Sequence, residues 1–83
     1  MYTVIVEKSV IKQLEKIPTP FFGRIKKALT SLALDPRPKG YLKLKGREGY
    51  RIRIGDYRII YEIKDQQLFV LVITIAHRKD VYE

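Results

Sequence analysis

The pattern of apolar residues at the start of the chain predicts a short strand followed by a helix. Residues 2–7, YTVIVE, are rich in β-branched side chains, a composition typical of strands. Apolar residues at positions 10, 11, 14 and 17 then recur at helical spacing. Ser9 is the expected N-cap of this helix, and Pro18 is expected to end it.

A second helix is predicted directly after the first. An apolar stripe runs from Phe21 to Leu32 at helical spacing, which suits a helix that packs one face on a core. Thr19 is the expected cap, and Pro20 takes the first helical position, where its missing N–H costs nothing. The Asp-Pro pair at 35 and 36 is expected to end the helix.

The second half of the chain predicts three strands, at 50–54, 57–63 and 68–76. The last is apolar on both faces, which indicates an interior strand. The predicted order is β-α-α-β-β-β, an α+β fold with two N-terminal helices on one face of a mainly antiparallel sheet. With 83 residues, the chain is expected to form one domain, residues 1–83.

The turn between the first two of these strands predicts their register. Only Gly55 and Asp56 separate them, a pair suited to a two-residue hairpin turn with glycine first. Counting outward from this turn places Arg53 directly opposite Arg58. One face then carries Tyr50, Ile52, Ile54, Tyr57, Ile59 and Tyr61, and the other carries Arg51, Arg53 and Arg58.

Two interpretations of this arginine face are open. Like charges directly opposite each other destabilise a strand pair by up to about 1 kcal/mol, and an anion between the guanidinium groups removes that repulsion. The face is therefore a candidate phosphate site. Alternatively, it is an ordinary solvated face whose arginines pair in part with Glu62 or Asp56.

The charge balance indicates a polyanionic partner. The chain has 17 Lys and Arg against 9 Asp and Glu, a net charge of +8, which suits nucleic acid, an acidic protein or an anionic membrane surface. The connector 36–49 is an expected basic loop that contains Lys39, Lys43, Lys45 and Arg47. No cysteine, signal peptide or membrane-length apolar run occurs, so a cytoplasmic protein without membrane attachment is expected.

The last residues, AHRKDVYE, add candidates for chemistry. His77 is the one histidine, and its ordinary pKa of about 6.5 suits proton transfer. Arg78 adds a fixed charge, and Tyr82 offers a ring or a hydroxyl. A polar terminus without function is the alternative. Because the chain has no Gly-rich phosphate loop and no metal-ligand pattern, any chemistry is expected to be metal-free phosphoryl transfer, as in a metal-independent ribonuclease.

Together these features resemble the RelE/ParE superfamily of bacterial and archaeal toxins, nearest to the RelE-type mRNA endonucleases. The segments DPRPKGYLKLKG, GYRIRIGDYRIIYEI and HRKDVY carry the resemblance, which covers essentially the whole chain. It implies a microbial-ribonuclease-like fold without a cofactor, and mRNA cleavage in the ribosomal decoding site. It also implies an acidic, RelB-like antitoxin, with operator DNA bound only through the antitoxin complex.

The resemblance also implies a set of site residues. The two basic residues that alternate on the strand entering the hairpin fall on Arg51 and Arg53, where the best-known RelE pattern has lysines; arginine is a poor proton acceptor. The implied catalytic set is Arg51, Arg53, Arg58, His77, Arg78 and Tyr82, with His77 as the leading proton-transfer residue. Lys39, Lys43, Lys45 and Arg47 are expected to bind ribosomal RNA.

Two other functions fit the same features. A ParE-like inhibitor of DNA gyrase would use the arginines as a docking face without nuclease chemistry. A basic module that only binds nucleic acid would tolerate His77→Ala. His77 and the alternating RIR segment favour the nuclease.

Overall fold

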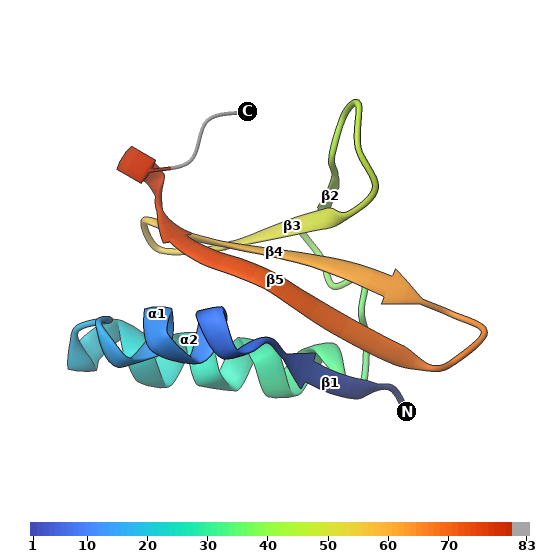
Figure 1. Ribbon diagram of the computed structural model, residues 1–83, viewed down its shortest axis with the longest axis horizontal. Coiled ribbons are helices and arrows are strands. Elements are labelled where there is room, and N and C mark those ends of the chain that lie inside the picture. Colours follow the sequence, from blue (N-terminus) through green and yellow to red (C-terminus); the bar gives the residue numbers. More distant parts are fainter. Residues whose placement is uncertain (81–83) are drawn as a thin grey trace.

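The computed structural model describes residues 1–80, which fold into a five-stranded sheet and two α-helices (Figure 1). The elements along the chain are β1 (Thr3–Val6), α1 (Lys8–Glu15), α2 (Thr19–Leu32), β2 (Leu42–Lys43), β3 (Tyr50–Ile54), β4 (Tyr57–Lys64), β5 (Phe69–His77) and the short 3-10 helix η1 (Arg78–Asp80). Neither α-helix is long and apolar enough to cross a membrane.

The sheet has the strand order β1-β5-β4-β3-β2. β1 pairs with β5 in parallel, and the other neighbours are antiparallel. β5 lies between β1 and β4, as its apolar sequence predicts, and both helices lie on the same side of β3, β4 and β5 (Figure 1). The predicted α+β fold is therefore confirmed.

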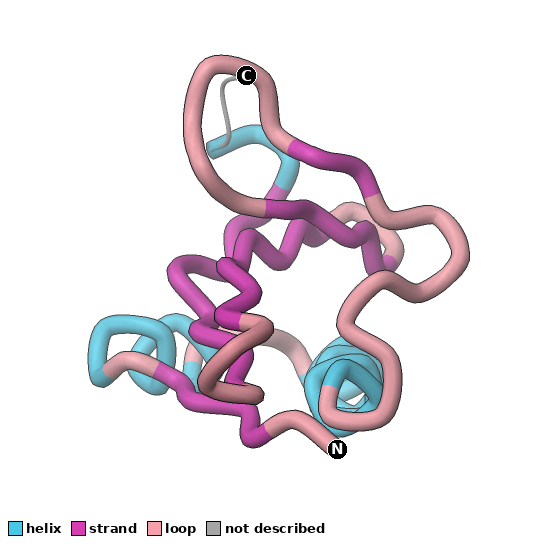
Figure 2. Tube along the Cα trace, turned by 90° about the vertical axis from the view of Figure 1, so that its right-hand side faces the viewer, coloured by secondary structure: helices cyan, strands magenta, loops and turns pink. Residues whose placement is uncertain are grey.

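One strand was not predicted. β2 occupies Leu42–Lys43, inside the segment expected to be a loop, and pairs with Tyr50 and Arg51 of β3. Two residues are too few for alternation to show in a sequence. The loop between β2 and β3 projects away from the helices in both views (Figures 1 and 2).

Both helices begin one or two residues earlier than predicted. Ser9 is inside α1 and is not its N-cap; Glu7 is, because its carbonyl already accepts hydrogen bonds from the N–H groups of Val10 and Ile11. Thr19 is likewise inside α2, whose N-cap is Pro18. Neither cap residue forms a side-chain hydrogen bond.

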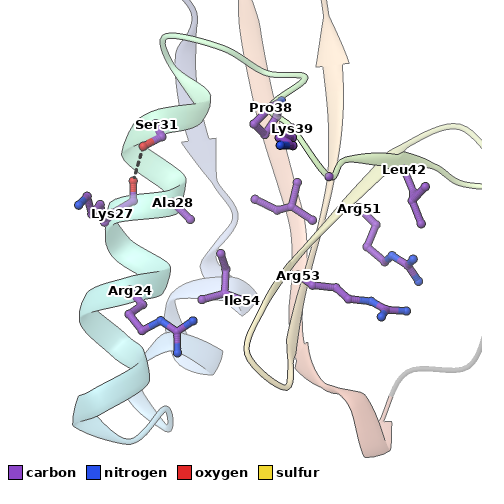
Figure 3. A pocket seen from close by; sticks show the side chains of 12 residues that line it. Arg24, Lys27, Ala28, Ser31, Pro38, Lys39, Leu42, Arg51, Arg53 and Ile54 are labelled. Carbon is purple, nitrogen blue, oxygen red and sulfur yellow. Dashed lines mark hydrogen bonds between the residues drawn. The ribbon is translucent and has the colours of Figure 1, made fainter.

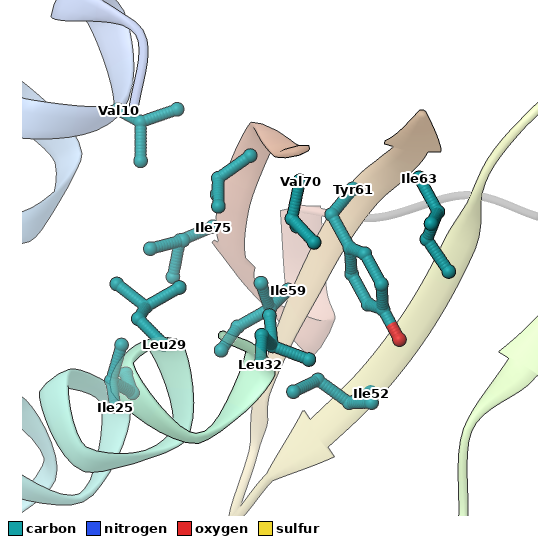
Figure 4. Packing of buried hydrophobic residues seen from close by; sticks show 11 residues of the cluster. Val10, Ile25, Leu29, Leu32, Ile52, Ile59, Tyr61, Ile63, Val70 and Ile75 are labelled. Atoms are coloured by element: carbon teal, nitrogen blue, oxygen red, sulfur yellow. The ribbon is translucent and has the colours of Figure 1, made fainter. Parts of the chain in front are cut away.

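The core lies between the helices and the predicted apolar face of the hairpin. Val10 of α1 and Ile25, Leu29 and Leu32 of α2 pack with buried residues of β3, β4 and β5 (Figure 4). Tyr61 is fully buried among them. Its hydroxyl donates a hydrogen bond of 2.7 Å to the carbonyl of Pro36, and burial raises its pKa well above the ordinary value.

An ion pair fixes the start of the segment after α2. Arg37 donates to the carboxylate of Asp65 at 3.0 Å, and its guanidinium lies 5.4 Å from the centre of the Tyr50 ring. Tyr2 donates its hydroxyl to the same carboxylate at 2.6 Å. The Arg37 and Tyr2 hydrogen bonds lower the pKa of Asp65. This cluster ties the basic segment to β1 and to the turn after β4.

Candidate functional site

The predicted register of the β3–β4 hairpin is confirmed at every pair. Arg53 is directly opposite Arg58, Arg51 is opposite Ile60, and Tyr50 is opposite Tyr61. Gly55 begins the turn with a φ of +60°, a conformation that glycine adopts without strain. The two-residue turn therefore sets which side chains share the arginine face, defined here as Arg51, Arg53 and Arg58.

The three arginines differ in exposure. Arg53 is exposed and Arg58 is partly buried, but Arg51 is only 5% exposed. Arg51 was expected on an open face; it is buried, and it pairs with Leu42 of β2 on one side and Ile60 of β4 on the other. Figure 3 shows Arg51 and Arg53 extending from β3 to the same side, away from α2, whereas Ile54 points toward α2. The arginine face thus has one buried positive charge, on Arg51, and one accessible positive charge, on Arg53.

Glu62 and Asp56, the two carboxylates named above as possible partners of this face, pair with other residues. Glu62 pairs with Lys64 at 3.3 Å. Asp56 lies 3.7 Å from Nε of Arg78 and 4.0 Å from Nε2 of His77. Within residues 1–80, no ion pair joins Arg53 to a carboxylate.

His77 is on the other side of the sheet from the arginine face. It is the cross-strand partner of Tyr57, whereas Arg58 is opposite Ala76. Side chains of cross-strand partners share a face, and the rings of His77 and Tyr57 meet edge-on with centroids 5.3 Å apart. The structure therefore does not bring His77 together with Arg53 and Arg58.

A bulge between β4 and β5 explains this placement. Tyr61 pairs with Val72, but Ile60 pairs with Thr74, so β5 carries one extra residue at this point. A shift of one residue moves every following side chain to the opposite face. Without the bulge, His77 would share the face of Arg58.

Arg78 lies at the same end of the sheet as the hairpin turn. Its backbone N–H donates to the carbonyl of Asp56 at 2.7 Å, and its side chain is 64% exposed. The chain end after β5 is thus joined to the Gly55-Asp56 turn, next to Arg58 in the register. Tyr82, the remaining member of the predicted catalytic set, lies outside the described residues.

The four basic residues expected to bind RNA are all exposed but lie in two places. Lys43 is in β2, and Lys45 and Arg47 are in the projecting loop that follows it. Lys39 instead lines a groove of about 810 Å³ between α2 and β3 (Figure 3). The structure separates Lys39 from the other three.

This groove was not expected from the sequence. Its lining consists of Arg24, Lys27, Ala28 and Ser31 of α2, Pro38, Lys39 and Gly40 of the connector, Leu42 of β2, and Arg51, Ile52, Arg53 and Ile54 of β3. The spacing of Arg24, Lys27 and Ser31 on one side of α2 was the available signal. No group of three potential metal ligands occurs among residues 1–80.

Comparison with known proteins decides the family. The family model for the ParE toxin of type II toxin–antitoxin systems (parDE) matches residues 4–82 of this chain. The chain belongs to the RelE/ParE toxin superfamily. This toxin is 31% identical to toxin RelE3 of Methanocaldococcus jannaschii over 90 residues, which cover 96% of this chain and 94% of the relative.

Solved RelE structures share the whole fold of this toxin. The archaeal RelE–RelB complex from Pyrococcus horikoshii matches with a TM-score of 0.84 and 28% identity, over 96% of this chain and 98% of that chain. The intact E. coli RelBE toxin–antitoxin complex matches with a TM-score of 0.80 and 25% identity, over 93% of this chain and 96% of that chain. The family match carries the ParE name and these relatives the RelE name.

Proposed function

We propose that this type II toxin is a metal-independent endoribonuclease that cleaves mRNA in the decoding site of the ribosome. The observation that carries the proposal is the direct opposition of Arg53 and Arg58, with Arg51 on the same face. Paired guanidinium groups hold a phosphate through charge-assisted hydrogen bonds, which offset their repulsion. The resemblance to RelE-type endonucleases supports the same target.

The proposed reaction is attack by an RNA 2′-oxygen on the adjacent phosphorus. The new O–P bond forms a 2′,3′-cyclic phosphate, and the bond from phosphorus to the 5′-oxygen breaks. The proton-transfer residue takes the proton from the 2′-hydroxyl and passes it to the departing 5′-oxygen, so no net proton is gained or lost. Arg51, Arg53, Arg58 and Arg78 stabilise the additional negative charge of the transition state.

We assign proton transfer to Tyr82 and not to His77. Arginine does not give up its proton at physiological pH, and His77 packs on Tyr57, away from the arginine face. Tyr82 is the other candidate that the resemblance supplies. The ribosome would contribute to substrate positioning, which reduces the number of catalytic groups that the toxin itself must provide.

The proposed partners follow from this target. Lys43, Lys45 and Arg47 would contact the RNA backbone from β2 and the projecting loop, and Lys39 from the groove. Affinity for ribosomes would therefore fall steeply with salt. An acidic antitoxin, RelB in the solved relatives, would neutralise the toxin and link it to operator DNA. A ribosomal target would require the toxin to act in the cytoplasm.

The test is primer extension on mRNA from a translating extract that contains the toxin. We expect new 5′ ends only when ribosomes translate, and their loss with Arg58→Ala. Lys26→Ala, which changes an exposed cation of α2 outside the arginine face, is the control and should cleave like wild type. Full cleavage by Arg58→Ala would contradict the anion site.

The match to the ParE family supports a second candidate, inhibition of DNA gyrase. In that case purified gyrase would lose supercoiling activity when the toxin is added, and mRNA would stay intact. A module that only binds nucleic acid would leave both reactions unchanged.

A further inference from the structure

Three tyrosine rings form a row at the start of β3, on the side of the sheet opposite the arginine face. Tyr61 is fully buried, and its ring stacks with that of Tyr50 at a centroid distance of 6.0 Å and an interplanar angle of 28°. The ring of Tyr41, which directly precedes β2, contacts that of Tyr50 at a centroid distance of 5.9 Å. Tyr41 is 37% exposed, so the row ends in an aromatic ring that solvent can reach.

The Tyr41 ring is held in place by its neighbours. Its backbone N–H donates to the carbonyl of Pro38 at 3.0 Å, across a turn in which Gly40 has a φ of +93°. Tyr50, against which the ring packs, is itself fixed between Tyr61 and the guanidinium of Arg37, which lies 5.4 Å from the centre of the Tyr50 ring. A flat ligand that stacks on Tyr41 would therefore cost little side-chain entropy.

Lysines flank this exposed ring along the chain. Lys43 is the cross-strand partner of Tyr50, so the two side chains share a face. Tyr41 is two residues before Lys43, a spacing that places both on one side of a strand. Lys39 and Lys45 continue the same alternation in the sequence, and both are exposed. An exposed ring beside a line of cations is the combination that binds single-stranded nucleic acid.

These surroundings favour an unpaired base over a protein segment. Lysine is depleted from the cores of protein interfaces, but Lys39 and Lys43 both lie close to the ring in sequence. The carboxylate of Asp65, at this end of the sheet, already pairs with Arg37 at 3.0 Å. Every base has a face that can stack on an aromatic ring. Bases in a duplex already stack on one another, so the ring selects an unpaired one.

The row and the arginine face serve different parts of an RNA. Tyr50 and Arg51 are adjacent in β3, so their side chains point to opposite sides of the sheet. A base on Tyr41 therefore belongs to a different RNA segment from the phosphate that Arg53 and Arg58 are proposed to hold.

We propose that the ring of Tyr41 stacks on an unpaired base of ribosomal RNA and that Lys43 binds the adjacent phosphate. This contact anchors the toxin without taking part in the chemistry. That the base is ribosomal rests on the proposed function. Stacking on an unpaired base does not.

The first test uses the full-length toxin and two short 2′-O-methyl RNA oligomers, which cannot be cleaved. One carries adenine at every position, and the other lacks its bases but has the same number of phosphates. The wild-type toxin should prefer the adenine oligomer, and Tyr41→Ser should lower this preference at least about fivefold, as for the loss of one stacked base. An unchanged preference in Tyr41→Ser would overturn the proposal.

Two control variants separate stacking from a general loss of exposed rings. Tyr41→Phe keeps the ring and should bind both oligomers like wild type. Phe22→Ser removes a ring of α2 that is 38% exposed and should keep the preference for adenine. An equal loss of preference in Phe22→Ser and Tyr41→Ser would overturn the proposal.

The second test addresses the ribosomal source of the base. In cosedimentation at fixed salt, Tyr41→Ser should bind ribosomes at least about fivefold more weakly than wild type, and its single-turnover cleavage rate at saturating toxin should be unchanged. Wild-type affinity for ribosomes, or a lower rate at saturation, would overturn the ribosomal assignment. Cosedimentation and oligomer binding do not require cleavage, so both decide this proposal even if the toxin is not a nuclease.

Discussion

The imidazole of His77 packs edge-on against the ring of Tyr57, with the two centroids 5.3 Å apart. Tyr57 in turn contacts Phe21 of α2, with centroids 5.5 Å apart, and packs on the core. His77 is therefore part of an aromatic cluster on the helix side of the sheet. Its neighbour Arg78 is joined to the hairpin turn, where its backbone N–H donates to the carbonyl of Asp56.

This contact predicts that His77 is dispensable for cleavage. His77→Gln should cut ribosome-bound mRNA at close to the wild-type rate, because the side chain faces away from Arg53 and Arg58. Tyr82→Phe should lose roughly 100-fold or more, the range for removal of a proton-transfer group. Single-turnover cleavage followed by primer extension measures both. A loss in His77→Gln as large as that in Tyr82→Phe would restore the histidine to the catalytic set.

The Arg37–Asp65 pair predicts a loss of stability in acid. Hydrogen bonds from Arg37 and Tyr2 lower the pKa of Asp65 below its ordinary value of 3.8. The unfolded chain therefore binds a proton here more readily than the folded chain does. The stabilisation is complete above the ordinary pKa and disappears as pH falls through the lowered, folded value.

Urea unfolding at a series of pH values measures this effect. Asp65→Asn should flatten the acid side of the stability curve relative to wild type. Glu15→Gln, which removes an exposed carboxylate of α1, is the control and should leave that slope unchanged. An unchanged acid slope in Asp65→Asn would show that the pair does not stabilise the fold.

Two glycines should respond oppositely to alanine. Gly55 has a φ of +60°, and an added Cβ would lie 3.2 Å from Cε1 of Phe21. Gly55→Ala should therefore lower the free energy of unfolding by about 1–2 kcal/mol, the cost of a left-handed non-glycine residue. Gly23 is inside α2 with open space around it, so Gly23→Ala should raise stability by about 0.5–1 kcal/mol. Urea unfolding of both variants checks the difference, and equal effects would contradict the predicted turn geometry.

The sequence predicted local geometry better than long-range placement. The β3–β4 register followed from a two-residue turn and from alternation, both of which are local. The side of the sheet on which His77 lies depends on a bulge opposite Ile60 and Tyr61. No residue type in this segment predicts that bulge. The groove beside β3 is lined in part by Leu42 of the two-residue strand β2, whose pairing was likewise not visible in the sequence.

The central claim is that Arg53 and Arg58 hold the scissile phosphate of mRNA between them. Cleavage of ribosome-bound mRNA by Arg53→Thr tests it most directly, because Arg53 is exposed and threonine suits a strand. We expect the cleavage rate to fall by roughly 100-fold, as for removal of one transition-state donor. The free energy of unfolding should not fall, since the substitution removes a like-charged neighbour of Arg58. Cleavage at the wild-type rate by a folded Arg53→Thr toxin would contradict the claim.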